Sequence, residues 1–182
     1  MIGIIILGVI VVLVLIFIGL YNRIVELENR IDNAASQIDV QLKKRADLVP
    51  NLVETVKGYA AHEKGILETI TKLRSELIKA KDLQTKTKVG NQLQEALKSL
   101  FAVAENYPTL KANENFLQLQ QELSDIEDKI AYARQYFNDT VLAFNNTIEK
   151  FPGNIVAKMM NKKEKPYLEV PESEKQVVKV KF

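Results

Sequence analysis

The stretch that decides the fold is MIGIIILGVIVVLVLIFIGLYN, residues 1–22, which contains no charged side chain. The 25 Lys and Arg and the 23 Asp and Glu all lie at Arg23 or later. As a helix, residues 2–20 would be about 28 Å long, which matches the hydrocarbon thickness of a bilayer. A cleaved signal peptide would have a basic start, a shorter apolar run and a small-residue cleavage site, and a core helix would show a polar face. Neither fits, so we expect residues 1–21 to be a retained transmembrane anchor.

The orientation of this anchor follows from the basic residues that flank it. Only Met1 precedes the apolar run, whereas Arg23 and Arg30 follow it and 43–45, KKR, comes a little later. Because Lys and Arg favour the cytoplasmic side of a membrane helix, we expect the N-terminus outside and the remaining chain in the cytoplasm.

The residues after the anchor repeat apolar side chains at spacings of three and four, which is typical of amphipathic helices. Such a stripe runs from Ile24 to Leu42 without an intervening Gly or Pro, so the anchor should continue into a cytoplasmic helix. We expect Pro50 to begin a second helix that ends near Leu77, and residues 81–91 to form a polar connection. The alternative is that Pro50 only kinks one continuous helix from Tyr21 to Leu77, which would leave three helices.

Two further helices complete the expected set. The third begins after the polar connection and ends at Pro108, and the fourth is capped by Asn113 or Asn115 and extends over about 35 residues to Phe151. Four helices with one apolar face each favour an all-α, up-and-down antiparallel four-helix bundle over residues 22–154. Residues 155–182 form a basic, amphipathic segment and an extended tail. Its end, 178–182, alternates like a short strand, or is a frayed terminus.

The composition excludes most sites of chemistry. The chain has no Cys and one His, so disulfides, thiolate metal sites and a His-built zinc site or catalytic triad are not expected. A formal charge of +2, with no cluster of aromatic and basic residues, argues against a nucleic-acid partner. No Gly-rich phosphate loop or Gly-x-Ser-x-Gly nucleophile motif occurs. We therefore expect no catalytic residues, no metal, no cofactor and no enzymatic activity.

A dense polar cluster around Pro50 is the candidate interaction surface. Gln37, Gln41 and Arg45 follow at intervals of four and so form one row of a helix. The alternative is a solvated face with ion pairs between helices. The candidate residues are Gln37, Asp39, Gln41, Arg45, Asp47, Asn51, Glu54, Lys57, Tyr59 and His62.

A second candidate surface is basic and lies after Phe151. Counting four alternating helix directions returns the chain to the membrane at Phe151, so this segment should meet anionic lipid, with Ile155 and Val156 near the interface as well. An ordinary solvated linker is the alternative. The candidate lipid contacts are Lys158, Met159, Met160, Lys162, Lys163 and Lys165.

Several blocks of the sequence resemble the bacterial LemA family. The longest are SQIDVQLKKRADLVPNLVETVKGYA (36–60) and AENYPTLKANENF (104–116), and shorter ones are YNRIV (21–25), HE (62–63), AR (133–134), YFN (136–138) and FPGN (151–154). The resemblance implies an inner-membrane helix with a short external end and a cytoplasmic up-and-down helical bundle. It implies no reaction and brings no catalytic residues. Ala35 stands where the family commonly has a tryptophan, and this departure weakens any role assigned to that side chain.

These observations favour a structural rather than a catalytic role. We expect a non-enzymatic, membrane-anchored helical scaffold, coiled-coil-like and self-associating into a homo-oligomer at the inner membrane. The alternative is an adaptor or accessory subunit that docks a partner membrane protein, such as a protease or a secretion component.

Overall fold

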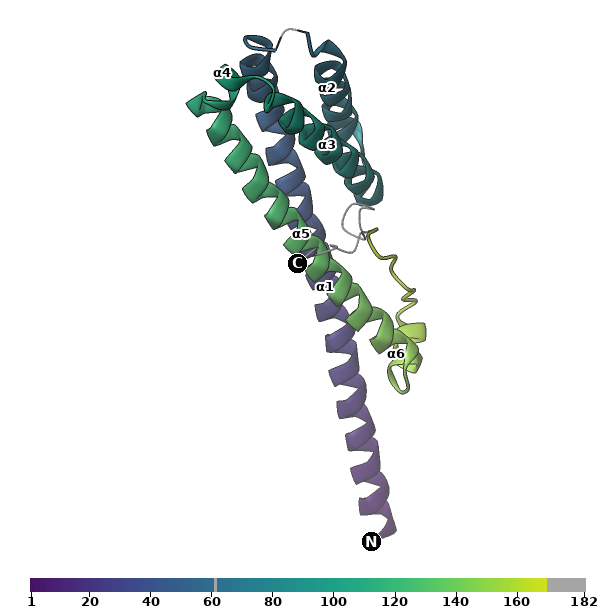
Figure 1. The fold of residues 1–182 in the computed structure, drawn as a ribbon. Coiled ribbons are helices and arrows are strands. Elements are labelled where there is room, and N and C mark those ends of the chain that lie inside the picture. Colours follow the sequence, from purple (N-terminus) through teal and green to yellow (C-terminus); the bar gives the residue numbers. More distant parts are fainter. Residues whose placement is uncertain (61, 170–182) are drawn as a thin grey trace, which may run out of the picture. The chain divides into compact units, whose positions relative to one another are not determined.

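The computed structural model describes residues 1–60 and 62–169, and within these residues every regular secondary-structure element is a helix (Figure 1). The all-α fold is therefore confirmed, whereas the strand expected at 178–182 lies outside the described residues. The helices are α1 (Ile2–Lys57), α2 (Lys64–Lys79), α3 (Leu83–Ala104), α4 (Pro108–Lys111), α5 (Glu114–Glu149) and α6 (Gly153–Met159).

The chain divides into two compact units. Among the described residues, unit 1 contains Met1–Ala35 and Arg134–Tyr167, and unit 2 contains residues 36–133 together with Leu168 and Glu169. Helices α1 and α5 each contribute one part to each unit.

Unit 1 joins the apolar N-terminal helix to a small helical core. Residues 1–19 are all exposed, and this part of α1 is long and apolar enough to cross a membrane. Burial begins at Ile24 and follows the expected spacing through Leu27, Ile31 and Ala34. The second half of α5 runs antiparallel to α1 (Figure 1). It contributes a matching stripe of buried apolar side chains, Phe137, Val141, Phe144 and Ile148. Helix α6 adds two more buried side chains, Val156 and Ala157.

Unit 2 contains the second half of α1, the first half of α5, and α2, α3 and α4 between them. Helix α2 packs along α3. Side-chain caps fix two of the helix starts: the Asp82 carboxylate accepts from the Thr85 N–H at 2.8 Å, and the Asn113 carbonyl oxygen accepts from the Phe116 N–H at 3.0 Å. The cap at Asn113 confirms one of the two positions predicted for it.

Helix α1 does not end at Pro50, so the prediction of a helix boundary there was wrong. It continues to Lys57, and the chain turns between Gly58 and Glu63. Proline lacks an N–H group, so the Ala46 carbonyl four residues earlier has no helical donor. The Arg74 Nε of α2 donates to this oxygen at 2.8 Å. The expected number of long helices is nevertheless retained as α1, α2, α3 and α5, so the single helix from Tyr21 to Leu77 is excluded.

The polar stretch at 81–91 is also not a connection, because α3 already begins at Leu83 and contains Gly90. A Cβ atom at Gly90 would lie 2.7 Å from Leu42 Cδ2 and 3.0 Å from Arg45 Nη2. Glycine at this position is therefore explained by the close approach of α3 to α1, not by a turn.

Candidate functional site

Arg45 lies in the interior of unit 2, although the sequence placed it on the candidate surface. Its side chain is almost completely buried, with Nη1 2.5 Å from Glu127 Oε2 on α5 and Nη2 donating to the Gly90 carbonyl of α3 at 3.0 Å. A buried guanidinium requires such partners, because desolvating an unpaired charge is costly. Arg45 thus connects three helices and is not available to an external ligand.

The other members of the candidate surface do not form one patch. Asp39 pairs with Lys86 of α3 at 2.5 Å, and the Tyr59 hydroxyl accepts from Asn113 at 3.0 Å. Glu54 and Lys57 pair with each other along α1. Of the remaining members, Gln37, Asp47, Asn51 and His62 are exposed to solvent. The arrangement agrees better with the alternative reading, a solvated face with ion pairs between helices.

Gln37 and Gln41 nevertheless line a groove of about 510 Å³ between α1 and α5 in unit 2. The groove also contains two exposed apolar side chains, Val40 (50% exposed) and Tyr132 (76% exposed). Sequence reasoning missed both because they lie outside the buried stripes. The sequence did contain a signal for them, because Val40 and Tyr132 are apolar residues that do not fall on the buried stripe of their helix. The lining is Ser36, Gln37, Val40, Gln41, Asp128, Lys129, Tyr132 and Ala133. This α1–α5 groove is the part of the candidate surface that remains open.

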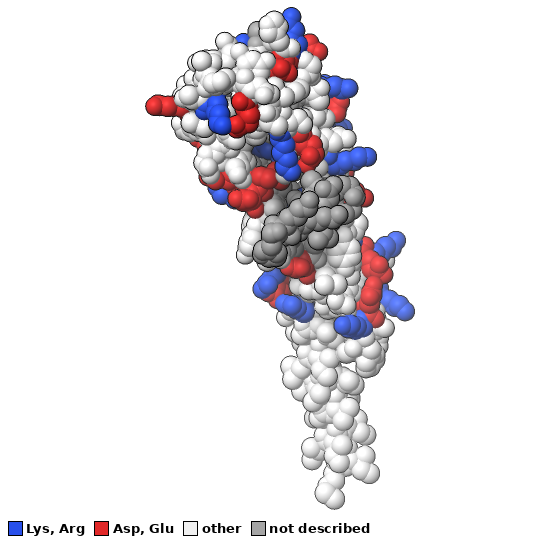
Figure 2. Space-filling model, in the orientation of Figure 1, with Lys and Arg blue, Asp and Glu red and all other residues white. Residues whose placement is uncertain are grey.

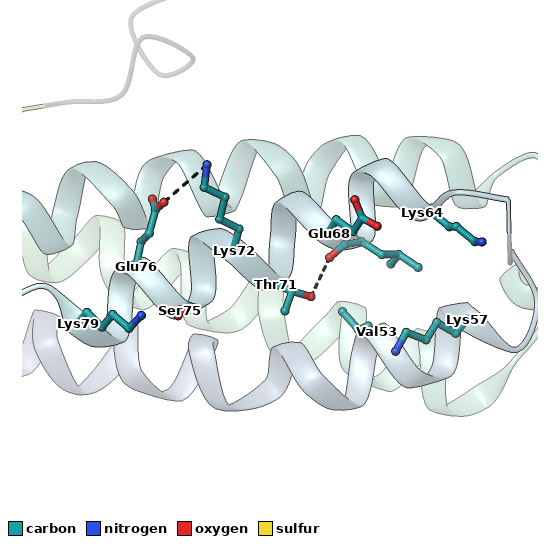
Figure 3. Close-up of a pocket in the computed structure, with 10 residues that line it drawn as sticks. Val53, Lys57, Lys64, Glu68, Thr71, Lys72, Ser75, Glu76 and Lys79 are labelled. Carbon is teal, nitrogen blue, oxygen red and sulfur yellow. Dashed lines mark hydrogen bonds and ion pairs between the residues drawn. The ribbon is translucent and has the colours of Figure 1, made fainter.

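A wider groove of about 970 Å³ runs between the end of α1 and α2 (Figure 3). Its apolar contribution comes from Val53 and Leu67, while charged side chains of both signs surround it. Lys72 and Glu76 approach to 4.0 Å across one turn of α2. The charged lining is Lys57, Lys64, Glu68, Lys72, Glu76 and Lys79.

The predicted lipid-contact residues fall into two groups within unit 1. Lys162 and Lys165 are partly buried beside α1, with Lys162 Nζ 2.5 Å and Lys165 Nζ 3.4 Å from the Glu28 carboxylate. The hydrogen bond from Lys162 holds the pKa of Glu28 below its usual value. Lys158, Met159 and Lys163 are exposed, and Met160 is partly exposed. Val156, which was also expected near lipid, is buried in the core of unit 1.

Comparison of the sequence with known proteins shows to which family the chain belongs. The sequence profile of the LemA family matches residues 34–182. The chain belongs to the LemA family. It is 29% identical over 147 residues to Protein LemA of Metamycoplasma hominis, covering 80% of this chain and 67% of the relative. It is 26% identical over 163 residues to the magnetosome protein MamQ of Magnetospirillum gryphiswaldense, covering 75% of this chain and 60% of the relative.

A second MamQ relative, the magnetosome protein MamQ 1 of Paramagnetospirillum magneticum, gives the same identity and coverage as the first. The chain therefore spans about two thirds of the length of the LemA relative and less of the MamQ proteins. The region matched by the LemA profile begins at residue 34 and so contains Arg45 and its partners Gly90 and Glu127, but only the second part of α1.

Proposed function

We propose that this LemA-family chain is a non-enzymatic, membrane-anchored scaffold that self-associates. The observation that carries the proposal is the continuity of α1: one helix from Ile2 to Lys57 forms both the apolar N-terminal segment and a wall of the α1–α5 groove. The groove therefore belongs to the same chain segment that the bilayer would hold. Relatives named for the magnetosome, a cellular structure and not a reaction, support a structural role.

The α1–α5 groove has the composition of a modest protein interface. An exposed tyrosine, an exposed valine and two glutamines lie beside one acidic and one basic residue, Asp128 and Lys129. Aromatic residues are enriched in interfaces, and neighbouring charges of opposite sign can pair with a symmetry-related copy. We therefore assign this groove to contacts between copies of the chain at the inner membrane.

The test compares full-length protein and a Tyr132→Asp variant in mild detergent by light scattering. We expect the unmodified protein to be oligomeric and the variant to lose mass, because a carboxylate in a buried contact is costly. Ile78→Asp is the control, since Ile78 is also exposed on unit 2 but lies outside the groove.

A monomer for all three proteins would contradict self-association. If the monomer gains mass only when native membrane extract is added, the adaptor alternative replaces the scaffold. The charged groove of Figure 3 would then be the first surface to mutate.

A further inference from the structure

The end of unit 1 that carries α6 is tied to α1 close to the apolar segment. Lys162 and Lys165 both bind Glu28, and Lys165 also approaches Asp32 at 3.9 Å. The Asn145 side chain makes two hydrogen bonds to the Lys165 backbone, at 2.9 and 3.0 Å, which attach the same segment to α5. Glu28 follows Leu20 by eight residues, or about 12 Å of helix. These contacts place the segment just beyond the headgroup region of a bilayer spanned by residues 2–20.

The turn after α5 extends further toward that bilayer. Helix α5 runs antiparallel to α1 in unit 1, and the α5–α6 turn faces the N-terminal part of α1 (Figure 1). Phe151 follows Asn145 by six residues, and the four of them that are helical, up to Glu149, span about 6 Å. This distance covers about half of the 12 Å between Glu28 and Leu20, so the turn at Phe151 extends from the tied segment toward the headgroups.

Three large apolar side chains are exposed at this end of the unit. Phe151 is 80% exposed, Ile155 53% and Met159 70%, and they are spaced by four residues. The opposite face of α6 already packs into unit 1 through Val156 and Ala157, both 3% exposed. The three exposed side chains are therefore not part of the core of unit 1. Exposed apolar side chains gathered at one end of a unit indicate an interaction site.

The charges around these three side chains suit an anionic surface. Lys158 and Lys163 are exposed and form no ion pair within residues 1–60 and 62–169. Two acids, Glu149 and Glu164, share this end, and the hydrogen bond that the Glu149 carboxyl shares with Glu164 raises the pKa of Glu149. In the space-filling view, charged side chains begin where the uncharged N-terminal part of α1 ends (Figure 2).

We propose that Phe151, Ile155 and Met159 insert into the interface of the bilayer that α1 spans, while Lys158 and Lys163 contact anionic headgroups. Unit 1 is then held to the membrane at two points, the α1 anchor and the α5–α6 end. Exposed apolar residues flanked by lysines are the usual composition of an interfacial contact. The inference rests on the membrane anchoring in the proposed function.

Because the chain has no Cys, single-cysteine variants can each carry one environment-sensitive fluorophore. The full-length protein is reconstituted in vesicles of phosphatidylcholine with phosphatidylglycerol. Quenching by nitroxide lipids is compared with quenching by aqueous iodide at Met159→Cys and at Leu142→Cys. Leu142 is the matched control, because it is an exposed apolar residue of unit 1 on α5, more than two turns before Phe151.

We expect lipid quenching at Met159 to exceed that at Leu142 by at least about twofold, with a blue-shifted emission, as for a group at the interface. A K158Q/K163Q protein should lose the dependence of this difference on phosphatidylglycerol. Equal iodide accessibility at Met159 and Leu142 would overturn the proposal and favour a solvated basic linker.

A label at Ile10→Cys, within the apolar segment, distinguishes a failure of the interfacial contact from a failure of the membrane anchoring. Strong lipid quenching at Ile10 with none at Met159 rejects only the interfacial contact. No lipid quenching at Ile10 rejects the anchoring, and the interfacial contact with it.

Discussion

Gly90 is the residue at which the close approach of α3 to α1 can be tested. Gly90→Ala would place a methyl group 2.7 Å from Leu42 Cδ2, and Leu42 is itself buried. We expect a loss of about 1 to 2 kcal/mol in the free energy of unfolding, because overpacking outweighs the better helix propensity of alanine. Urea denaturation of the full-length protein in detergent, followed by circular dichroism, measures it. Gly65→Ala, which meets no atom within 4 Å, should be neutral or stabilising. An equal response of both variants would contradict the packing explanation.

Arg45 and Glu127 should behave as a coupled pair. Arg45→Met or Glu127→Leu alone leaves one partly or fully buried charge without its partner, and we expect each to cost about 3 kcal/mol. The double variant replaces both charges by apolar groups and should recover most of that loss. A double-mutant cycle by chemical denaturation determines the coupling free energy. Additive single effects would show that the pair acts as two independent residues.

At the scale of the element, α1 passes through Pro50 because α2 supplies the missing donor. Arg74→Met removes the hydrogen bond to the buried Ala46 carbonyl, and we expect it to cost about 1 to 3 kcal/mol. Pro50→Ala restores an N–H within the helix, so the same Arg74 substitution should cost less in that background. Thermal unfolding of the four proteins measures the difference. An undiminished cost would mean that Arg74 contributes through packing and not through this bond.

The helices themselves were predictable to the extent that neighbours along the chain determine them. The stripe from Ile24 to Leu42 and the cap at Asn113 follow from local spacing and local hydrogen bonding, and both are confirmed. Pro50 and Gly90 were misread because their partners, Arg74 and Leu42, are distant in sequence. The burial of Arg45 has the same cause, since Glu127 follows it by 82 residues. A row of polar residues along a helix does not show which of its side chains is buried and paired with a residue of another helix.

The contact between α1 and the segment after α6 should depend on pH through Glu28. Its folded-state pKa lies below the usual 4.5, so its contribution to stability is fully present above that pH and is lost as the pH falls through the lowered pKa. Lys162→Gln should therefore cost up to about 1 kcal/mol at neutral pH and nothing in acid. The free energy of unfolding at both pH values checks this. Lys163→Gln is the control, and a pH-independent cost at Lys162 would contradict the ion-pair explanation.

For the whole molecule, the basic residues of unit 1 support a prediction of its orientation in the membrane. Arg23 and Arg30 follow the apolar segment directly, and the contacts of Lys162 and Lys165 with Glu28 bring the basic segment after α5 to the same side. Lys and Arg close to a membrane helix favour the cytoplasm, so we predict that the N-terminus lies outside and that everything after Tyr21 lies inside.

Single cysteines measure this orientation directly. A membrane-impermeant maleimide should label a cysteine placed before Met1 by a short polar extension in intact cells but should label Lys98→Cys, on the exposed face of α3, only after lysis. The first site precedes the apolar segment and the second belongs to unit 2, so the two sites report opposite sides of the membrane. The reverse labelling pattern would place the bundle outside the cell. It would also move the lysines around Phe151 to the external leaflet, where the negative surface potential of the cytoplasmic leaflet does not act.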